Sequence, residues 1–279
     1  MMIAGPRAPK EPRGPGTLGP HVHSQPLRSP AISTVGLRKT FGDLVAVDGI
    51  DLVVPRGSFY GFLGANGAGK STTIKCLTGL LRPTSGTCTI LDLDPFADPV
   101  AVKRRIGVVP EDLALFERLT GVETLAFVGQ VHGLDGATVR ARSRELLDLM
   151  DLGGAAGDLV ADYSHGMRKK VALAAALLPA PRLLFLDEPF EGIDAVASRL
   201  IKGLLSRFVR GGGTVFLTSH ILEIVERLCD HLGIIHRGRI VAQGPRETLS
   251  GAGGSLEETF LRLVGAERAA APALEWLAG

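Results

Sequence analysis

The chain has 279 residues, 45% of them hydrophobic, and a formal net charge of +2, so it can form a sizeable core and has no charge excess directed at nucleic acid or an anionic membrane. No apolar run approaches the ~18–20 residues of a membrane helix, and three widely spaced cysteines fit neither a metal site nor a disulfide framework. We therefore expect a cytoplasmic protein that does not bind nucleic acid and that lies at a membrane only if another protein holds it there.

The first segment, residues 1–30, is rich in proline, glycine and basic residues and cannot bury enough apolar surface to fold alone, so we expect a disordered tail. Strands are predicted over residues 32–37 and 45–54, separated by a turn at Gly42. Phe41 lies in this turn region. It is either a core residue or an exposed ring on which a base could stack.

A phosphate-binding motif follows a short apolar strand. The pattern G-x-x-x-x-G-K-[ST] is matched by Gly64, Ala65, Asn66, Gly67, Ala68, Gly69, Lys70 and Ser71, with Thr72 next. The glycines allow backbone N–H groups to face phosphate oxygens, and the helix that follows adds the positive end of its dipole. Lys70 is then expected to reach the β- and γ-phosphates, and the Ser71 hydroxyl to bind Mg²⁺.

The middle of the chain changes in character. Strands are predicted over residues 87–91 and 105–110, the second ending at Glu111, with a loop over 94–99. Two amphipathic helices over 121–132 and 138–150 follow. On the second helix the side chains of Arg140, Arg142 and Arg144 are expected to form a solvated face, and Ser164 is a candidate N-cap of a further helix.

Polar side chains follow two later apolar strands. Asp187 and Glu188 end the run that begins at Leu183, and His220 follows the strand predicted over 214–217. Asp187 is expected to hold Mg²⁺ through water, and Glu188 to orient or deprotonate an attacking water. Because ligands bind at the carboxyl ends of parallel strands, His220 is a candidate for a γ-phosphate contact.

The order of elements predicts an α/β fold: a P-loop NTPase core with a mostly parallel sheet, an antiparallel β region near the N-terminus and an inserted α-helical subdomain. A helix is expected to begin near Gly192, two strands to lie within 233–243, and a helix to span 256–264. We predict an ordered domain over 31–265, with helical insertion about 112–180, and a C-terminal extension over 266–279.

Residues 31–243 resemble an ATP-binding subunit of an ABC transporter. The phosphate loop and the Asp187-Glu188 strand are common to P-loop ATPases. The segment Tyr163-Ser164-His165-Gly166-Met167 between them makes the resemblance specific, and with Arg168-Lys169-Lys170 it is most similar to the ABC-2 type exporter subfamily.

The resemblance implies ATP and Mg²⁺ as ligands and assigns roles to individual residues. Phe41 matches the aromatic that stacks on adenine, Glu188 the catalytic carboxylate, and His220 the switch histidine. Ser164 and Gly166 match the signature that contacts the γ-phosphate bound to the opposite subunit, and Asp194 matches a loop that links the two sites.

Two positions depart from the pattern of the family. His165 replaces a common glycine, so its side chain has to point away from the phosphate. Glu111 replaces a common glutamine; a carboxylate there can ligate the metal but, when ionised, cannot donate a hydrogen bond. A solvated loop acid is the alternative for Glu111.

The resemblance further implies a homodimer or a paired ATPase subunit, and a transmembrane permease subunit docked on the helical insertion. The chain would then energise export from the cytoplasmic face of the membrane. A soluble, non-transport ABC ATPase acting on a cytosolic assembly is the main alternative. A binding-only regulator is a third, against which Lys70, Asp187, Glu188 and His220 argue.

Overall fold

The computed structural model describes residues 1–2, 5, 29–250 and 255–265; the predictions made for residues 6–28 and 266–279 lie outside this part of the chain. Its elements are β1 (Ile32–Phe41), β2 (Leu44–Ile50), β3 (Val53–Val54), β4 (Phe59–Leu63), α1 (Lys70–Leu77), β5 (Ser85–Ile90), α2 (Pro99–Lys103), β6 (Ile106–Val109), α3 (Gly121–Val131), α4 (Gly136–Leu149), α5 (His165–Leu177), β7 (Leu183–Asp187), α6 (Ala195–Arg210), β8 (Thr214–Ser219), α7 (Leu222–Leu228), β9 (His231–His236), β10 (Arg239–Pro245), α8 (Arg246–Ser250) and α9 (Leu256–Leu263).

A six-stranded sheet in the order β10-β9-β4-β8-β7-β6 forms the centre of the molecule. All pairs in it are parallel except β10 with β9. Every residue of β4, β7 and β8 is buried, as expected for parallel strands covered on both faces, which is why these strands are continuous apolar runs in the sequence. The predicted P-loop α/β fold is confirmed.

The register of the parallel strands brings their carboxyl ends to one edge. Leu63 of β4 lies opposite Ser219 of β8, and Asp187 of β7 lies opposite Thr218 of β8. Val109 of β6 pairs with Leu186. Whatever follows these four strands in the chain is therefore presented at the same edge of the sheet.

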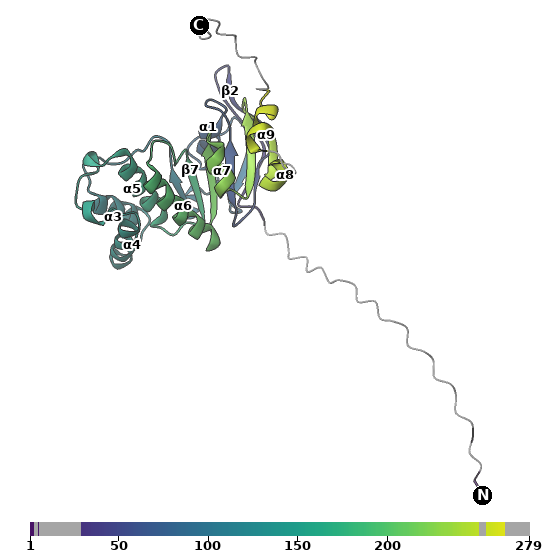
Figure 1. Ribbon diagram of the computed structural model, residues 1–279, viewed down its shortest axis with the longest axis horizontal. Helices are drawn as coiled ribbons and strands as arrows, with labels where there is room; N and C mark the ends of the chain where they lie inside the picture. Colours follow the sequence, from purple (N-terminus) through teal and green to yellow (C-terminus); the bar gives the residue numbers. More distant parts are fainter. Residues whose placement is uncertain (3–4, 6–28, 251–254, 266–279) are drawn as a thin grey trace, which may run out of the picture.

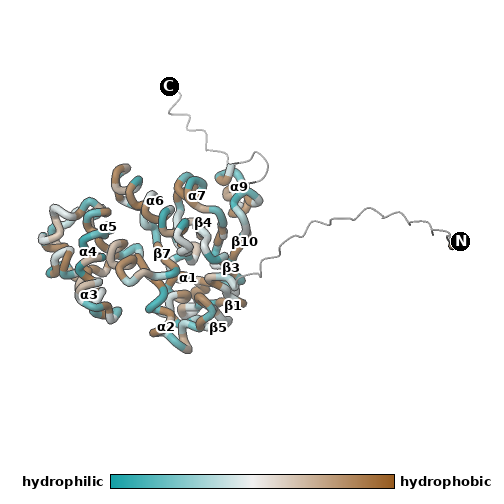
Figure 2. Tube along the Cα trace, turned by 90° about the horizontal axis from the view of Figure 1, so that it is seen from below, coloured by the Kyte–Doolittle hydropathy of each residue, from teal (hydrophilic) through white to brown (hydrophobic). Residues whose placement is uncertain are grey.

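An antiparallel sheet of β1, β2, β3 and β5 covers one side of this core, as predicted for the N-terminal region. Its inner residues pack with Ile74 and Leu77 of α1 and with Phe216 of β8 in one hydrophobic cluster. Seen from below, β1, β3 and β5 lie together, with α2 beside β5, whereas α3, α4 and α5 form a separate group at the other side (Figure 2).

Helices α3, α4 and α5 project from the sheet as a helical subdomain (Figure 1). Local signals fix where they begin: Thr120 and Glu123 form a capping box on α3, Asp135 caps α4, and Ser164 caps α5 as predicted. The prediction of a solvated arginine face on α4 is wrong for Arg142, which is half-buried and donates a 2.9 Å hydrogen bond to the carbonyl oxygen of Leu178.

Three short helices, α2, α7 and α8, were not expected. Pro99 begins α2 instead of ending a loop, with the Asp98 side chain accepting a hydrogen bond from Ala101, and α7 follows directly after β8. Residues 192–194 precede α6, with Asp194 as its N-cap, so this helix begins slightly later than predicted. Among the described residues, no helix combines the length and the apolar character needed to cross a membrane.

The three cysteines are buried as free thiols in the two hydrophobic clusters. Burial raises the pKa of Cys76 to about 11 and that of Cys88 to about 12, and it also raises the pKa of Cys229. All three side chains therefore pack as small hydrophobic groups.

Candidate active site

The predicted phosphate loop joins β4 to α1, and close packing requires glycine at both of its ends. A Cβ atom at Gly64 would lie 2.6 Å from the carbonyl oxygen of Ile235, and one at Gly69 would lie 2.5 Å from that of Ala46. Gly69 also has a φ of 111°, at the N-cap of α1. The loop is thus held between β2 and β9, with only residues 65–67 exposed.

A pocket of about 500 Å³ opens beside this loop. It is lined by Phe41, Leu44, Val45, Ala46, Asn66, Gly67, Gly69, Lys70, Ser71, Thr72, Glu111 and Glu188. The ring of Phe41 is 47% exposed at its mouth, which argues against the core-packing alternative, and the Lys39 ammonium lies 5.1 Å from the ring centroid. The pocket thus joins an aromatic wall from the antiparallel sheet to polar groups from the parallel sheet.

Lys70, Glu188 and His220 form a chain of charged and polar groups at the edge of the parallel sheet. Glu188 Oε1 lies 3.2 Å from Lys70 Nζ, and Glu188 Oε2 lies 3.1 Å from His220 Nδ1. Lys70 Nζ also donates to the Gly64 carbonyl at 2.8 Å and lies 3.4 Å from that of Ala65. The Lys70 and Glu188 side chains are only 6% and 5% exposed, whereas that of His220 is 38% exposed.

Thr218 of β8 orders Asp187, the last residue of β7, and Glu188, which follows it. Its hydroxyl donates to Asp187 Oδ1 at 2.5 Å and accepts from the Glu188 backbone N–H at 3.1 Å. Asp187 and Glu188 therefore have fixed and different directions, with Asp187 held against β8 and Glu188 turned toward Lys70. Thr218 was not predicted as a site residue, although its place opposite Asp187 on the neighbouring strand follows from the parallel register.

Of the three predicted metal ligands, Ser71 and Glu111 lie close to each other. The Ser71 hydroxyl is 3.5 Å from Glu111 Oε2 across the pocket. Glu111 is exposed and follows the carboxyl end of β6, the strand next to β7. It also lines the pocket beside the phosphate loop, so it is not simply a solvated loop acid. Hydroxyl and carboxylate oxygens at this edge are the hard donors that Mg²⁺ prefers, and the donor set therefore fits this ion.

The signature residues lie elsewhere. Ser164, His165 and Gly166 begin α5 and do not line the phosphate-loop pocket, and Ser164 and His165 are exposed. The His165 ring lies over Gly192, because a Cβ built there would be 3.1 Å from its Cδ2 atom. Asp194 Oδ1 accepts a 2.8 Å hydrogen bond from the backbone N–H of Ala197, which lowers the pKa of Asp194.

A family model described as "ABC transporter" matches residues 47–191, more than half of the chain. The chain belongs to the ABC transporter family. It is 42% identical over 84% of its length, and 70% of the relative's, to the daunorubicin/doxorubicin resistance ATP-binding protein DrrA of Streptomyces peucetius. It is 38% identical over 83% of its length, and 71% of the relative's, to the Nod factor export ATP-binding protein I of Ralstonia nicotianae.

Solved structures agree with this assignment. An ATP-binding subunit of an ABC transporter superposes with a TM-score of 0.79 at 32% identity, covering 84% of this chain and 99% of that one. A dimeric bacterial ABC transporter cassette superposes with a TM-score of 0.71 at 25% identity, covering 77% and 99%. This ABC protein is therefore an ATP-binding subunit of a transporter and an ATPase, as the resemblance implied.

Proposed function

We propose that this ABC subunit works as a homodimer with two shared ATP sites, and that ATP-driven closure of the dimer drives export through a separate permease on the cytoplasmic face of the membrane. The observation that carries the proposal is the position of Glu188, buried between Lys70 and His220 at the rim of the phosphate-loop pocket. Export is the process named in the relative from Ralstonia nicotianae, and resistance to drugs is named in that from Streptomyces peucetius.

ATP would bind along the pocket, with its base on Phe41 and its phosphates in the loop. Lys70 Nζ now bonds to loop carbonyls, and the β- and γ-phosphates would take over these bonds because charge-assisted bonds to oxyanions are stronger. The backbone N–H groups of residues 64–72 and the start of α1 would hold the remaining phosphate oxygens.

Ser71, Glu111 and Asp187 would hold Mg²⁺, the first through its hydroxyl and Asp187 through water. When bound, the ion supplies charge neutralisation across the β- and γ-phosphates. Glu188 would accept a proton from the attacking water, and His220, whose Nδ1 lies 3.1 Å from Glu188 Oε2, would contact the γ-phosphate. Once a phosphate attracts Lys70, the carboxylate of Glu188 loses its closest cation and is available as a base.

The separation of the two sets of residues supports the proposed dimer. Ser164 and Gly166 lie outside the lining of the phosphate-loop pocket, so in one chain they contact no nucleotide bound there. A second copy would bring its own signature over the pocket, with Asp194 beside it. The fold of the dimeric cassette supports this arrangement.

The permease would dock in an apolar groove between the helical subdomain and the core. This groove has a volume of about 560 Å³, and its apolar lining includes Leu80, Val100, Leu113, Leu115, Val128 and Val131. Lys103, Arg104 and His132 also line it, and the exposed rings of Phe116 and Phe127 lie nearby with centroids 5.1 Å apart. A helix with one apolar face and acidic side chains beside it fits this combination.

The test combines oligomeric state, ATP hydrolysis and membrane recovery. Full-length chain should release phosphate from ATP and should shift from monomer to dimer on a light-scattering column when ATP is present. Tagged chain recovered from high-salt-washed native membranes should carry a stoichiometric multi-helix protein. Recovery only in the cytosol, with soluble partners or none, would overturn the transport role and favour the non-transport ATPase.

A further inference from the structure

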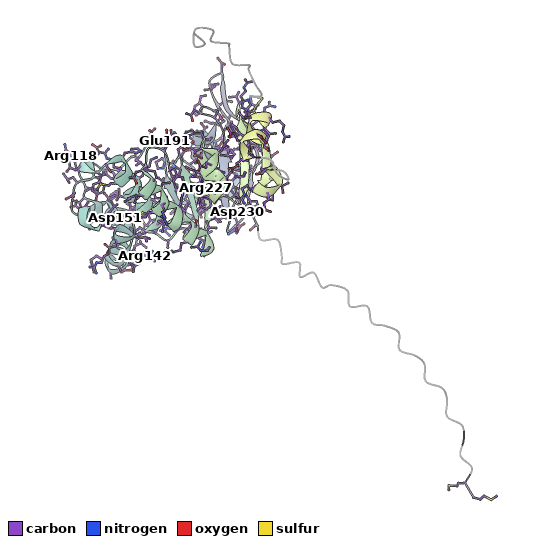
Figure 3. The ribbon with its side chains drawn as sticks, in the orientation of Figure 1. Arg118, Arg142, Asp151, Glu191, Arg227 and Asp230 are labelled. Atoms are coloured by element: carbon purple, nitrogen blue, oxygen red, sulfur yellow. The ribbon has the colours of Figure 1, made fainter. Side chains whose placement is uncertain are left out.

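A buried lysine connects the signature helix to the residues after β7. Lys169, in the second turn of α5, is 4% exposed. Its Nζ donates hydrogen bonds to the carbonyl oxygens of Glu188, at 2.9 Å, and Glu191, at 2.5 Å. Glu191 lies where the helical subdomain meets the sheet (Figure 3). One ammonium group thus holds both ends of a tight turn that begins at the candidate catalytic carboxylate.

Burying a charged ammonium group costs free energy, so nearby hydrogen bonds and negative charges have to offset it. Burial lowers the pKa of Lys169, and the negative charges of Glu191, Glu188 and Glu111 oppose this shift. Removing the ammonium would take this donor from two carbonyl oxygens, of which that of Glu188 is buried and that of Glu191 is part-buried. Structural lysines seldom occupy such a position unless they are fully hydrogen-bonded.

The backbone that Lys169 holds is strained at Glu188. This residue has a φ of 47°, in the left-handed region that non-glycine residues rarely adopt. Thr218 accepts the N–H of Glu188 and Lys169 donates to its carbonyl. Since both neighbouring peptide groups are tied, the side chain is directed toward Lys70 and His220, and loss of either tie would let it turn away.

The N-terminal end of α5, which carries the signature, also contacts residues 192–194. The His165 ring covers Gly192, whose φ of 67° disfavours any other residue and where an added Cβ atom would lie 3.1 Å from the ring. Asp194 Oδ2 lies 4.0 Å from the position of a Cβ atom at Gly166. Residues 188–194 and the signature end of α5 therefore form one packed unit within a single chain.

We infer that Lys169 is a positioning residue that fixes Glu188 to the helix carrying the signature, so that contact of the signature with the partner's nucleotide adjusts the carboxylate at the chain's own site. This inference rests on the proposed homodimer with shared sites. Lys169 does not line the phosphate-loop pocket; it acts through the carbonyl oxygens of Glu188 and Glu191.

The test compares Lys169→Met with Lys169→Arg and with the control Arg168→Met, all in the full-length chain. Lys169→Met is expected to lower kcat about 10- to 100-fold while the Kd for ATP changes less than about threefold, because the substitution displaces a catalytic group without removing a binding contact. Lys169→Arg should recover much of the activity. Arg168→Met removes a neighbouring cation that contacts Glu117 and Ala161, and should leave kcat within about twofold.

A double substitution separates positioning from a general loss of stability. If Lys169 acts through Glu188, adding Lys169→Met to Glu188→Gln should lower the residual kcat by less than about threefold. If the two substitutions lower kcat independently, so that their fold-losses multiply in the double variant, the inference is overturned. An unchanged kcat in Lys169→Met would overturn it as well. If Lys169→Met does not fold, Lys169→Gln, which retains a donor, takes its place in the same cycle. Absence of hydrolysis in the unmodified chain would instead contradict the proposed function.

Discussion

The phosphate-loop edge and the signature end of α5 differ in how complete they are within one chain. At the first, four strand ends converge, Lys70 and Glu188 are buried, and a pocket is formed. At the second, Ser164 and His165 face solvent at the start of a helix, with no pocket residue in common. This difference agrees with the proposal that the signature of one chain completes the nucleotide site of a second copy.

The largest expected effect tests the finished site. Glu188→Gln keeps the shape of the side chain but removes its ability to accept a proton, so kcat should fall about 10²- to 10⁴-fold. ATP binding should persist, and because hydrolysis no longer reopens the dimer, an ATP-bound dimer should accumulate on a light-scattering column. A kcat within about threefold of the unmodified chain would contradict the role of Glu188 as a base.

A mixed-dimer experiment tests whether the two regions belong to different sites. Gly166→Asp should fold, since a Cβ there meets nothing closer than 4.0 Å, but its carboxylate would repel the partner's γ-phosphate. Lys70→Ala should abolish phosphate binding in its own loop. Each variant alone should be nearly inactive.

Mixing the two variants should restore about a quarter of the specific activity, since about half of the dimers are mixed and each has one undamaged site. Phosphate release after refolding or subunit exchange measures this recovery. If no activity returns although mixed dimers form, the signature and the loop of the same chain would have to act together.

A smaller effect is expected at the aromatic wall. Phe41→Ala should weaken ATP binding about threefold to tenfold, in line with about 0.5–1.5 kcal/mol for stacking. The melting temperature should hardly change because the ring is half-exposed. Titration with ATP and with inorganic triphosphate, which has no base, gives the matched control: only the ATP affinity should drop.

The smallest effect concerns Glu111. Glu111→Gln removes a negative charge 3.5 Å from the Ser71 hydroxyl and adds an amide donor, so ATP binding should persist while kcat changes by about twofold to tenfold. Steady-state hydrolysis over a range of Mg²⁺ concentrations measures the change. Loss of nucleotide binding would show that this position is wrongly assigned.

The sequence was sufficient for the parts of the site that depend on chain order. The phosphate loop, the acidic pair and His220 each follow an apolar strand, and parallel strands bring their ends together. Ser164 as an N-cap could likewise be predicted from local chemistry. In contrast, α2 and α7 are short, and neither has an apolar period long enough to distinguish a helix from a loop.

The positions of charged side chains were harder to predict, because they depend on contacts between residues far apart in the sequence. Arg142 was expected in solvent, but the carbonyl of Leu178 at the end of α5 needs a donor that only the folded chain supplies. The burial of Lys169 could have been predicted from helical spacing. Ala172, Leu173 and Ala176 follow it by three, four and seven residues, so all four side chains lie on the same buried face of α5.

The three buried thiols make this protein convenient for spectroscopy. Since thiolates react with maleimides and each native thiol is both enclosed and hard to ionise, the native chain should take up almost no label. A single cysteine at Val196, which is 76% exposed beside Asp194, would then carry a fluorophore without removal of the natural cysteines. If the proposed dimer forms, energy transfer between two such labels would report whether it opens and closes during hydrolysis.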